Sequence, residues 1–298
     1  MGKKKKKSGK KLPVYFYPVI AGFLILAVAS AAWFLMISKE EKPAEKTGPV
    51  NILLLGNDLL VTNDVPDMLR VLLKNSQDVK DEVEVHSIAL PDAKYGVLNH
   101  LHSETLAELL KTRNDWDLVV LQESPEEILK RPYVLLTSIR ELKGKFNPKS
   151  KTRFVFVSPF TYRDREIEQM VVSSVTRKLA NNLSLQLAPV GEVFAKFQKT
   201  SPDIEIYMSD GRQANANGSF VMASTIYSVL TGKAPEVGDS EIGSVKLERG
   251  DMAQLSSLIA STVVARNRAY KLGLRMSPTN SRTLLPTDKK PTKTKVPI

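Results

Sequence analysis

Short apolar runs alternate with amphipathic segments over most of the chain. The apolar runs are expected to form strands because each is short and is buried on both sides when helices flank a sheet; they cover residues 50–55, 82–90, 117–122, 153–158 and 185–189. Helical spacing is seen at 65–74, 98–110, 125–143, 165–181, 191–198, 219–230 and 251–268. Strands that alternate with helices predict one α/β domain over residues 50–272, with a parallel sheet of about five strands covered on both faces.

A longer apolar run precedes this domain. The 27 positions from Leu12 to Ser38 hold no charged residue, and a membrane-spanning helix needs about 20 apolar residues. Seven lysines among residues 1–12 come before the run, so the positive-inside rule places the N-terminus in the cytoplasm. We therefore expect a basic cytoplasmic segment (1–12), a transmembrane helix (13–38), a linker (39–49) and an extracytoplasmic domain, either periplasmic or at the cell surface.

The alternative for this run is a cleaved signal peptide. Ala29-Ser30-Ala31 resembles a cleavage site, but the apolar run continues past it to Ile37, which is long for a signal peptide. Both interpretations place the domain outside the cytoplasm. The chain has no cysteine, which excludes disulfides, cysteine nucleophiles and cysteine-based zinc sites.

The net charge of +11 lies on the two ends of the chain. Residues 1–12 carry +7 and residues 281–298 carry +4, whereas residues 13–280 hold 31 basic and 31 acidic residues. A nucleic-acid-binding domain carries its basic surface on the fold itself, so nucleic acid is not an expected partner. Residues 273–298 lack apolar periodicity and are rich in Pro, Thr and Lys, which predicts a disordered basic tail.

Polar residues follow several predicted strands, at the edge where parallel sheets bind ligands. The segment Ile52–Asp58 resembles the first block of SGNH/GDSL hydrolases, where a strand leads into Gly-Asn-Ser or Gly-Asp-Ser. In one bacterial subgroup of that family, later blocks resemble Trp116–Glu123, Ala188–Val193, Asp210–Gln213 and Gly218–Phe220 of this chain. The resemblance spans residues 50–270 and implies a three-layer α/β/α fold of the flavodoxin-like type.

The resemblance fails at the two residues that transfer protons in that family. Its nucleophilic serine falls on Asp58 and its catalytic histidine falls on Gln213, while its acid is retained as Asp210. A serine esterase needs a hydroxyl that attacks and an imidazole that accepts the proton. Loss of either is expected to reduce the rate by roughly 10⁴-fold. The resemblance therefore implies a catalytically degenerate member, that is, a pseudoenzyme.

Eight residues at the strand ends are expected to surround a ligand cleft: Asn57, Asp58, Gly96, Gln122, Glu123, Asp210, Arg212 and Gln213. The backbone N–H of Asp58, Gly96 and Gln122 correspond to oxyanion-hole positions of the resembled family. Glu123 is either at the cleft rim or structural. Arg212 is expected to neutralise Asp58 or Asp210. Tyr162, Arg163 and Arg165 follow another strand and are further cleft candidates, whereas Ser124 before Pro125 is typical of a helix N-cap.

The three histidines do not complete a catalytic or metal site. His86 lies on a strand beside Glu84, while His100 and His102 are two residues apart rather than the four that a helical metal pair needs. We therefore expect no metal and no cofactor.

Three functions are compatible with these patterns. The leading one is a membrane-anchored extracytoplasmic pseudoenzyme that binds or scaffolds envelope polysaccharide or a protein partner. The alternative is an active esterase or acetyl-transfer enzyme with a non-standard site around Asp58. In a third, the domain is a spacer and the basic tail binds an anionic polymer.

Overall fold

A computed structural model describes residues 48–77, 79, 82–92, 95–146, 152–236 and 242–264. The expected cytoplasmic segment (1–12), transmembrane helix (13–38) and basic tail (273–298) lie outside these ranges, as does most of the linker. Within the described ranges, no helix is both long enough and apolar enough to cross a membrane.

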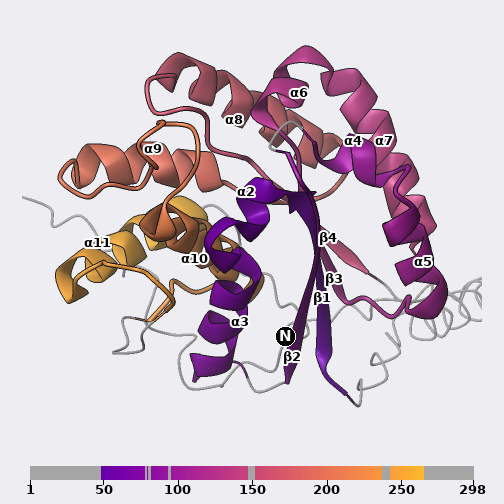
Figure 1. The fold of residues 1–298 in the computed structure, drawn as a ribbon, viewed down its shortest axis with the longest axis horizontal. Coiled ribbons are helices and arrows are strands. Elements are labelled where there is room, and N and C mark those ends of the chain that lie inside the picture. The colour runs from indigo at the N-terminus through magenta and orange to yellow at the C-terminus, as the bar shows by residue number, and fades with distance from the viewer. Residues whose placement is uncertain are drawn as a thin grey trace, which may run out of the picture. The chain divides into compact units, whose positions relative to one another are not determined.

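The five predicted strands form one sheet in which all neighbouring pairs are parallel. The strand order is β2-β1-β3-β4-β5, the flavodoxin-like order, and Figure 1 shows the sheet between its helices. The strands are β1 (Val50–Asn57), β2 (Val83–Leu90), β3 (Leu118–Gln122), β4 (Arg153–Val157) and β5 (Gln186–Ala188). The predicted parallel sheet of about five strands is thus confirmed.

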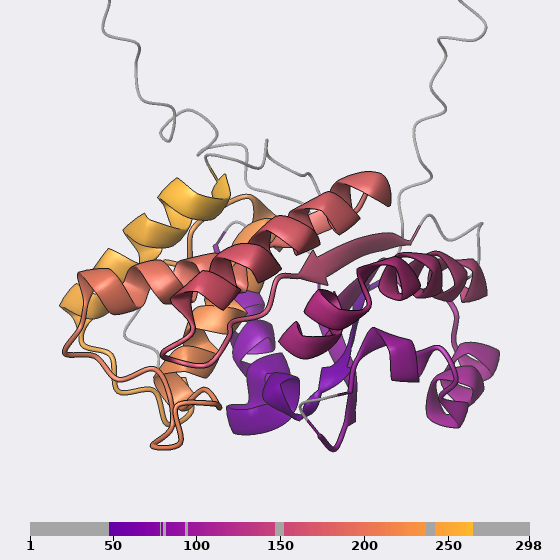
Figure 2. The same cartoon turned by 90° about the horizontal axis from the view of Figure 1, so that it is seen from above.

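The central strands are apolar throughout because both faces of the sheet are covered. Ile52 and Leu54 of β1 pack into one hydrophobic core, and Leu53 and Leu55 pack into the other, as the alternation of side chains along a strand requires. The first core includes α3 (Val65–Asn75), α9 (Val190–Thr200), α10 (Ala216–Thr231) and α11 (Arg249–Ile259). The second includes α4 (Val97–His100), α5 (Glu104–Thr112), α6 (Pro125–Lys130), α7 (Pro132–Lys145) and α8 (Glu166–Asn182). Figure 2 shows this three-layer arrangement from above, and it confirms the predicted α/β/α class.

Two of the predicted helices are each divided into two. The segment 98–110 forms α4 and α5, because Ser103 caps α5 by accepting the Leu106 N–H at 3.4 Å. The segment 125–143 is interrupted at Arg131, since Pro132 has no N–H to continue the helix and disfavours helical geometry at the residue before it. The short helix α2 (Asp58–Val61), which follows β1 directly, was not predicted.

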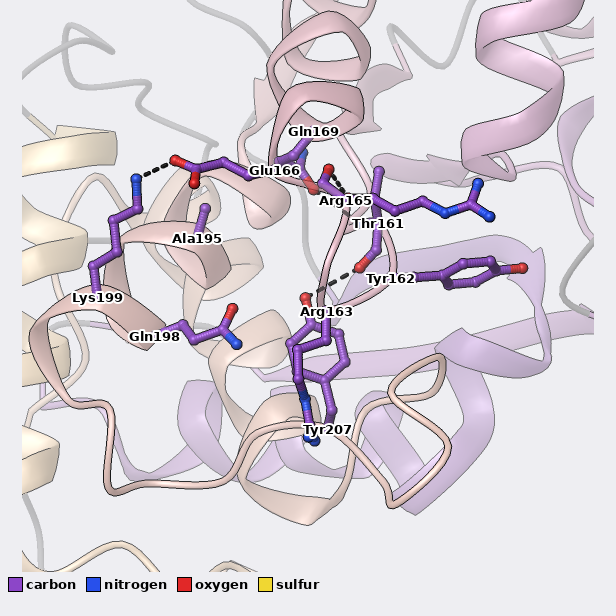
Figure 3. Close-up of a pocket in the computed structure, with 10 residues that line it drawn as sticks. All are labelled: Thr161, Tyr162, Arg163, Arg165, Glu166, Gln169, Ala195, Gln198, Lys199 and Tyr207. Carbon is purple, nitrogen blue, oxygen red and sulfur yellow. Dashed lines mark hydrogen bonds and ion pairs between the residues drawn. The ribbon is translucent and has the colours of Figure 1, made fainter.

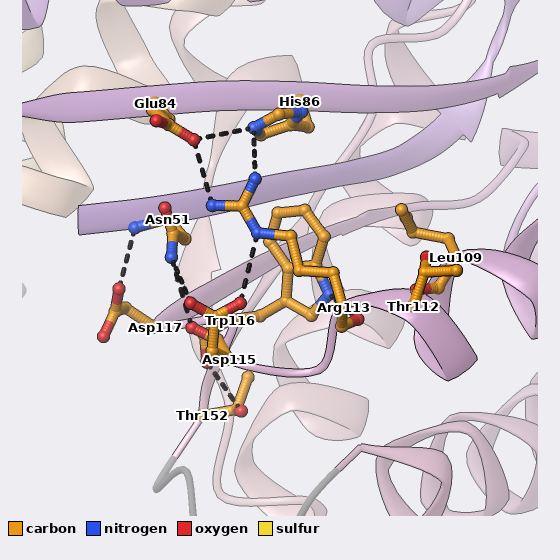
Figure 4. A network of polar contacts seen from close by, with 10 residues as sticks. All are labelled: Asn51, Glu84, His86, Leu109, Thr112, Arg113, Asp115, Trp116, Asp117 and Thr152. Atoms are coloured by element: carbon orange, nitrogen blue, oxygen red, sulfur yellow. Dashed lines mark hydrogen bonds and ion pairs between the residues drawn. The ribbon is translucent and has the colours of Figure 1, made fainter. Parts of the chain in front are cut away.

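A polar network ties together the amino ends of the strands, away from the cleft described below (Figure 4). The Asn51 N–H donates to Asp117 Oδ2 at 2.7 Å, and Arg113 Nη2 donates to Glu84 Oε2 at 2.9 Å. The hydrogen bond from Arg113 lowers the pKa of Glu84. His86 lies in this network, with Nε2 3.0 Å from Arg113 Nη1 and its side chain 42% exposed. His86 is therefore part of the structural network of the sheet and is remote from the carboxyl ends of the strands.

Candidate functional site

A cavity of about 370 Å³ opens at the carboxyl ends of the strands. This is the edge where the chain order reverses between β1 and β3, and such switch points are where doubly wound sheets bind ligands. Four of the eight expected cleft residues line the cavity, namely Asp58, Asp210, Arg212 and Gln213. Segments more than 150 residues apart in sequence therefore meet at one site.

Asn57 positions Asp58 without lining the cavity itself. Its side chain is fully buried, and its Oδ1 caps helix α2 by accepting the Leu59 N–H at 3.1 Å. Its Nδ2 donates to the backbone carbonyl of Tyr95 at 2.8 Å. The amide thus joins the end of β1 to the segment that follows β2, and it fixes the turn from which the Asp58 side chain faces the cavity.

The carboxyl group of Asp58 is in an unfavourable position for a negative charge. Burial raises its pKa, and the nearby carboxylate of Asp92 raises it further, although backbone N–H groups at Leu59 and Asp58 act in the opposite direction. Asp58 Oδ1 is buried and has no hydrogen-bond partner among the described residues. A buried acceptor of this kind is costly unless a donor reaches it, so the site favours a ligand that donates hydrogen bonds or carries positive charge.

Asp210 is held by the turn to which it belongs. Its Oδ1 accepts the backbone N–H of Arg212 at 2.8 Å and that of Gln213 at 3.2 Å. Gly211, which lies between Asp210 and Arg212, has φ +64°, the left-handed conformation that glycine adopts without strain. The two N–H donors lower the pKa of Asp210, so this carboxylate is ionised and fixed in place.

The positive charge of Arg212 acts on Asp210. It contributes to the lowered pKa of Asp210, whereas burial and the charge of Asp92 raise the pKa of Asp58. The Arg212 guanidinium lies over the ring of Tyr162, 5.4 Å from its centroid, and that of Arg165 lies 5.0 Å from the same ring. Cation–π contacts of this geometry are favourable, and they hold the 210–213 turn against the loop that follows β4.

Glu123 lies in the interior and not at the cleft rim. The residue is fully buried; its Oε2 accepts the Leu98 N–H at 3.1 Å and its Oε1 accepts the Ser124 N–H at 2.8 Å. Burial raises its pKa to about 7. Ser124 also caps α6, because its Oγ accepts the Glu127 N–H at 3.2 Å. Glu123 thus connects the start of α4 with the start of α6 behind the cavity.

Gly96 and Gln122 also lie behind the cavity. A Cβ atom on Gly96 would be 2.3 Å from Glu123 Oε1, so the close packing requires glycine. The Gly96 N–H points to Asn99 Oδ1 at 3.3 Å, which engages the donor that the family resemblance assigns to an oxyanion hole. Gln122 packs against Gly56 of β1, and its amide has no hydrogen-bond partner among the described residues.

Several cavity residues were not identified from the sequence. Asp92 follows the carboxyl end of β2, where ligand-binding residues are expected. Nothing in the sequence indicated that Phe160 and Thr161 line the cavity. Glu126 and Glu168 stand in the first turns of α6 and α8, where an acidic residue is expected for its interaction with the helix dipole alone. The cavity is consequently more acidic than the sequence indicated.

The described residues do not gather into a metal site: none of their His, Asp and Glu side chains form a group of three or more that could hold an ion. His100 is fully buried away from the cavity, with Nε2 2.7 Å from the carbonyl oxygen of Gly56. Burial lowers its pKa, so His100 is a neutral structural residue.

A second cavity, of about 240 Å³, is lined by the loop after β4 and by side chains of α8 and α9 (Figure 3). Thr161 and Tyr162 line both cavities. The cations at the second cavity are paired, since Arg163 Nη2 donates to Glu205 Oε1 at 2.7 Å and Lys199 forms an ion pair with Glu166. The loop after β4 is therefore a wall with a cavity on each side.

Comparisons with known proteins support the fold. No family model matches the chain, and no curated protein matches it. A solved structure from Slackia heliotrinireducens, described as a candidate SGNH hydrolase, is 23% identical, with a TM-score of 0.51 over 61% of this chain and 99% of its own. A DUF4886 family protein from Bacteroides uniformis is 13% identical, with a TM-score of 0.53 over 72% of this chain and 95% of its own.

The domain has an SGNH-hydrolase-like fold. The match covers 99% of the Slackia heliotrinireducens protein, so the shared fold is a whole domain and not a fragment. An SGNH-like fold supports many possible sites, because function depends on the residues that line them. In this chain, the 370 Å³ cavity is lined by several carboxylates, the guanidinium of Arg212 and the amide of Gln213.

Proposed function

We propose that the chain is a membrane-anchored extracytoplasmic binding or scaffolding module whose SGNH-like domain does not carry out hydrolysis. The observation that carries this proposal is that Asp58 and Gln213 line one cavity at the positions of the nucleophile and the base in the resembled family. Neither a carboxylate nor an amide provides the hydroxyl–imidazole pair on which acyl transfer by a serine depends.

The surroundings of these residues also oppose ester hydrolysis. Tetrahedral intermediates of acyl transfer develop a negative oxygen that an active site must stabilise with donors. Here the Asp58 carboxylate, with Asp92 nearby, would repel that oxygen. The Gly96 N–H is directed to Asn99, and the Asp210 carboxylate accepts two N–H donors of its own turn. The same features suit a ligand that carries donors or positive charge.

The proposed location follows from the first 38 residues. A 27-residue stretch without charge after seven lysines is typical of a single anchor with a cytoplasmic N-terminus. An electrically neutral body argues against nucleic acid as the partner, which leaves envelope polysaccharide or a protein. Protease treatment of cells tests this location. We expect digestion of the domain while the cytoplasmic membrane is intact. Digestion only after that membrane has been permeabilised would exclude both a cell-surface and a periplasmic location.

Turnover of a short-chain acyl ester by the full chain tests the absence of catalysis. We expect no turnover above that of boiled protein. Glu141→Gln is the folded control, because Glu141 is exposed on α7, outside the cavity lining. Turnover that is present in the unmodified chain and in Glu141→Gln, and is lost in Asp58→Ala, would refute the proposal.

That outcome would instead support the alternative, an esterase or acetyl-transfer enzyme that uses Asp58. The observation in its favour is that Asp58 combines a raised pKa with access to a cavity of about 370 Å³. A carboxylate nucleophile would take the acyl group as a mixed anhydride, with the alcohol leaving, and water would then release the acid. Transfer of ¹⁸O from labelled water into Asp58 would identify this route.

A further inference from the structure

The described part of the chain exposes seven large apolar side chains: Val61, Tyr133, Val134, Ile167, Met170, Val171 and Met208. Three of them are within two residues of a side chain that lines the 370 Å³ cavity. Ile167 precedes Glu168 directly, Met170 is two residues after Glu168, and Met208 is two residues before Asp210. Exposed apolar side chains that gather beside a cavity are a common mark of an interaction surface.

Three of these side chains lie on one face of α8. This helix buries Gln169, Val172 and Thr176 on its inner face. Its outer face carries Ile167, Met170 and Val171, which are 81%, 68% and 45% exposed; we call these three residues the α8 stripe. They are three and four positions apart, so they are neighbours on the helix surface. Glu168 lines the cavity, and Val171 is three residues after it, so the two side chains are neighbours on the helix surface. The stripe therefore begins at the rim of the cavity.

The charge inside the cavity determines what fits beside the α8 stripe. Glu126 and Glu168 already form ion pairs with Lys130 and Arg165. The lining also holds Asp58 and Asp210, and the positive charge of Arg212 acts on Asp210. Asp58 Oδ1 is buried without a hydrogen-bond partner among the described residues, so a cationic donor is the complementary group.

We propose that this surface binds a polypeptide segment in which a Lys or Arg side chain is flanked by apolar residues. The cation enters the cavity and reaches Asp58, while the flanking side chains cover the α8 stripe. This inference rests on the proposed function, because a cavity occupied by a partner segment is a binding site and not a catalytic one. It selects protein over polysaccharide as the partner.

The choice of protein over polysaccharide follows from two features. A sugar offers few groups that would cover side chains as apolar as Ile167 and Met170, whereas apolar peptide side chains cover them at a gain in free energy. Sugars also stack on open aromatic rings, and two guanidinium groups, those of Arg165 and Arg212, already lie over the Tyr162 ring.

The test measures binding of labelled nonapeptides to the full chain in lipid nanodiscs, with empty nanodiscs as the blank. The probe has a central lysine between leucines, and the matched probes carry norleucine or glutamate in place of the lysine. We expect the lysine probe to bind at least about tenfold more tightly than either, as for a buried charged anchor at an interface. Asp58→Asn should abolish this preference and Asp58→Glu should keep part of it.

The double variant Ile167→Ser/Met170→Ser tests the α8 stripe. Both side chains are exposed, so folding should be unaffected, and binding of the lysine and norleucine probes should weaken together by about tenfold. Glu141→Gln should bind as the unmodified chain does. Thermal unfolding of each variant shows that the loss is not due to unfolding.

Four outcomes would overturn the inference. The first is equal binding of the lysine and norleucine probes, and the second is a lysine preference that survives Asp58→Asn. The third is competition by a neutral or amino-sugar oligosaccharide together with no effect of the stripe variant, which would make polysaccharide the ligand. If sedimentation shows a dimer that the stripe variant abolishes, a second copy of the chain covers the stripe, and the inference is again wrong. None of these outcomes requires ester turnover, so they are distinct from a failure of the proposed function.

Discussion

The carboxylate of Asp210 accepts the backbone N–H of Gln213 at 3.2 Å, within a turn that also places the Arg212 N–H 2.8 Å from the same oxygen. In a catalytic triad, the acid orients the imidazole through such a hydrogen bond. Here the acid orients the backbone of its own loop, and the side chain three residues later is an amide. The loop geometry is thus maintained by Asp210 without any contribution to proton transfer.

The first prediction concerns restoration of acyl-transfer chemistry. Asp58→Ser alone should remain inactive because Gln213 cannot accept the serine proton. The double variant Asp58→Ser/Gln213→His should exceed either single variant in ester turnover by about 10²-fold or more, which is the usual contribution of a positioned base. Release of a chromogenic alcohol from a short-chain ester measures the rate. Equal rates in the double variant and in Asp58→Ser would show that the turn at Asp210 does not present an imidazole to the cavity.

The second prediction concerns packing between Gly96 and Glu123. A methyl group on Gly96 would lie 2.3 Å from Glu123 Oε1 and 2.8 Å from the Glu123 Cα, so Gly96→Ala should lower the free energy of unfolding by about 1–3 kcal/mol. Urea unfolding gives the value. The matched control is Gly144→Ala on α7, where a Cβ meets nothing within 4 Å; alanine should there stabilise the helix by about 0.5–1 kcal/mol. Equal effects of the two substitutions would contradict the close packing.

The third prediction is a pH dependence of stability that Glu123 causes. Its pKa is about 7 in the folded protein against a usual value of 4.5, so the folded state holds the proton more tightly than the unfolded state. The contribution of Glu123 to stability is therefore largest below pH 4.5 and falls as the pH rises to 7, by about 3 kcal/mol in total. The difference in unfolding free energy between the unmodified chain and Glu123→Gln should change by this amount between pH 4.5 and 8. A difference that is constant with pH would show that Glu123 titrates normally.

The fourth prediction separates the two hydrogen bonds of Asn57. Asn57→Ser keeps an oxygen that can cap α2 but loses the donor to the Tyr95 carbonyl, and it should cost about 1 kcal/mol. Asn57→Asp also keeps the cap, but it places a carboxylate beside that carbonyl and next to Asp58, so the loss should be larger, about 2–3 kcal/mol. Thermal unfolding at pH 7 measures both. If the two variants unfold at the same temperature, the bond to Tyr95 contributes little.

The strands could be predicted because burial on both faces leaves a direct mark on the sequence. Residues 52–55 are apolar at every position, and the structure distributes them alternately over two cores. The breaks within helices could be predicted less well. Pro132 is a local signal for a break, but the cap at Ser103 ends a helical pattern that the apolar spacing alone would have continued.

The candidate site shows a similar division. Asp58 follows β1 directly, so its place at the carboxyl edge follows from the parallel sheet. Asp210 lies after α9 rather than after a strand, and only the family resemblance indicated that it joins Asp58. The direction of Glu123 could not be obtained in this way, because it depends on two N–H donors, at Leu98 and Ser124, that only the folded chain presents. Glu168 was not identified, since its place on α8 has a sufficient explanation in the helix dipole.

The loop after β4 has one further consequence. Thr161 and Tyr162 belong to both cavities, and the Tyr162 ring is in contact with Arg165 and Arg212. A ligand that displaced this ring from one cavity would change the shape of the other and hence its affinity. Thermodynamic linkage makes that effect reciprocal. Two ligands that both moved this ring would therefore alter each other's affinity by the same factor.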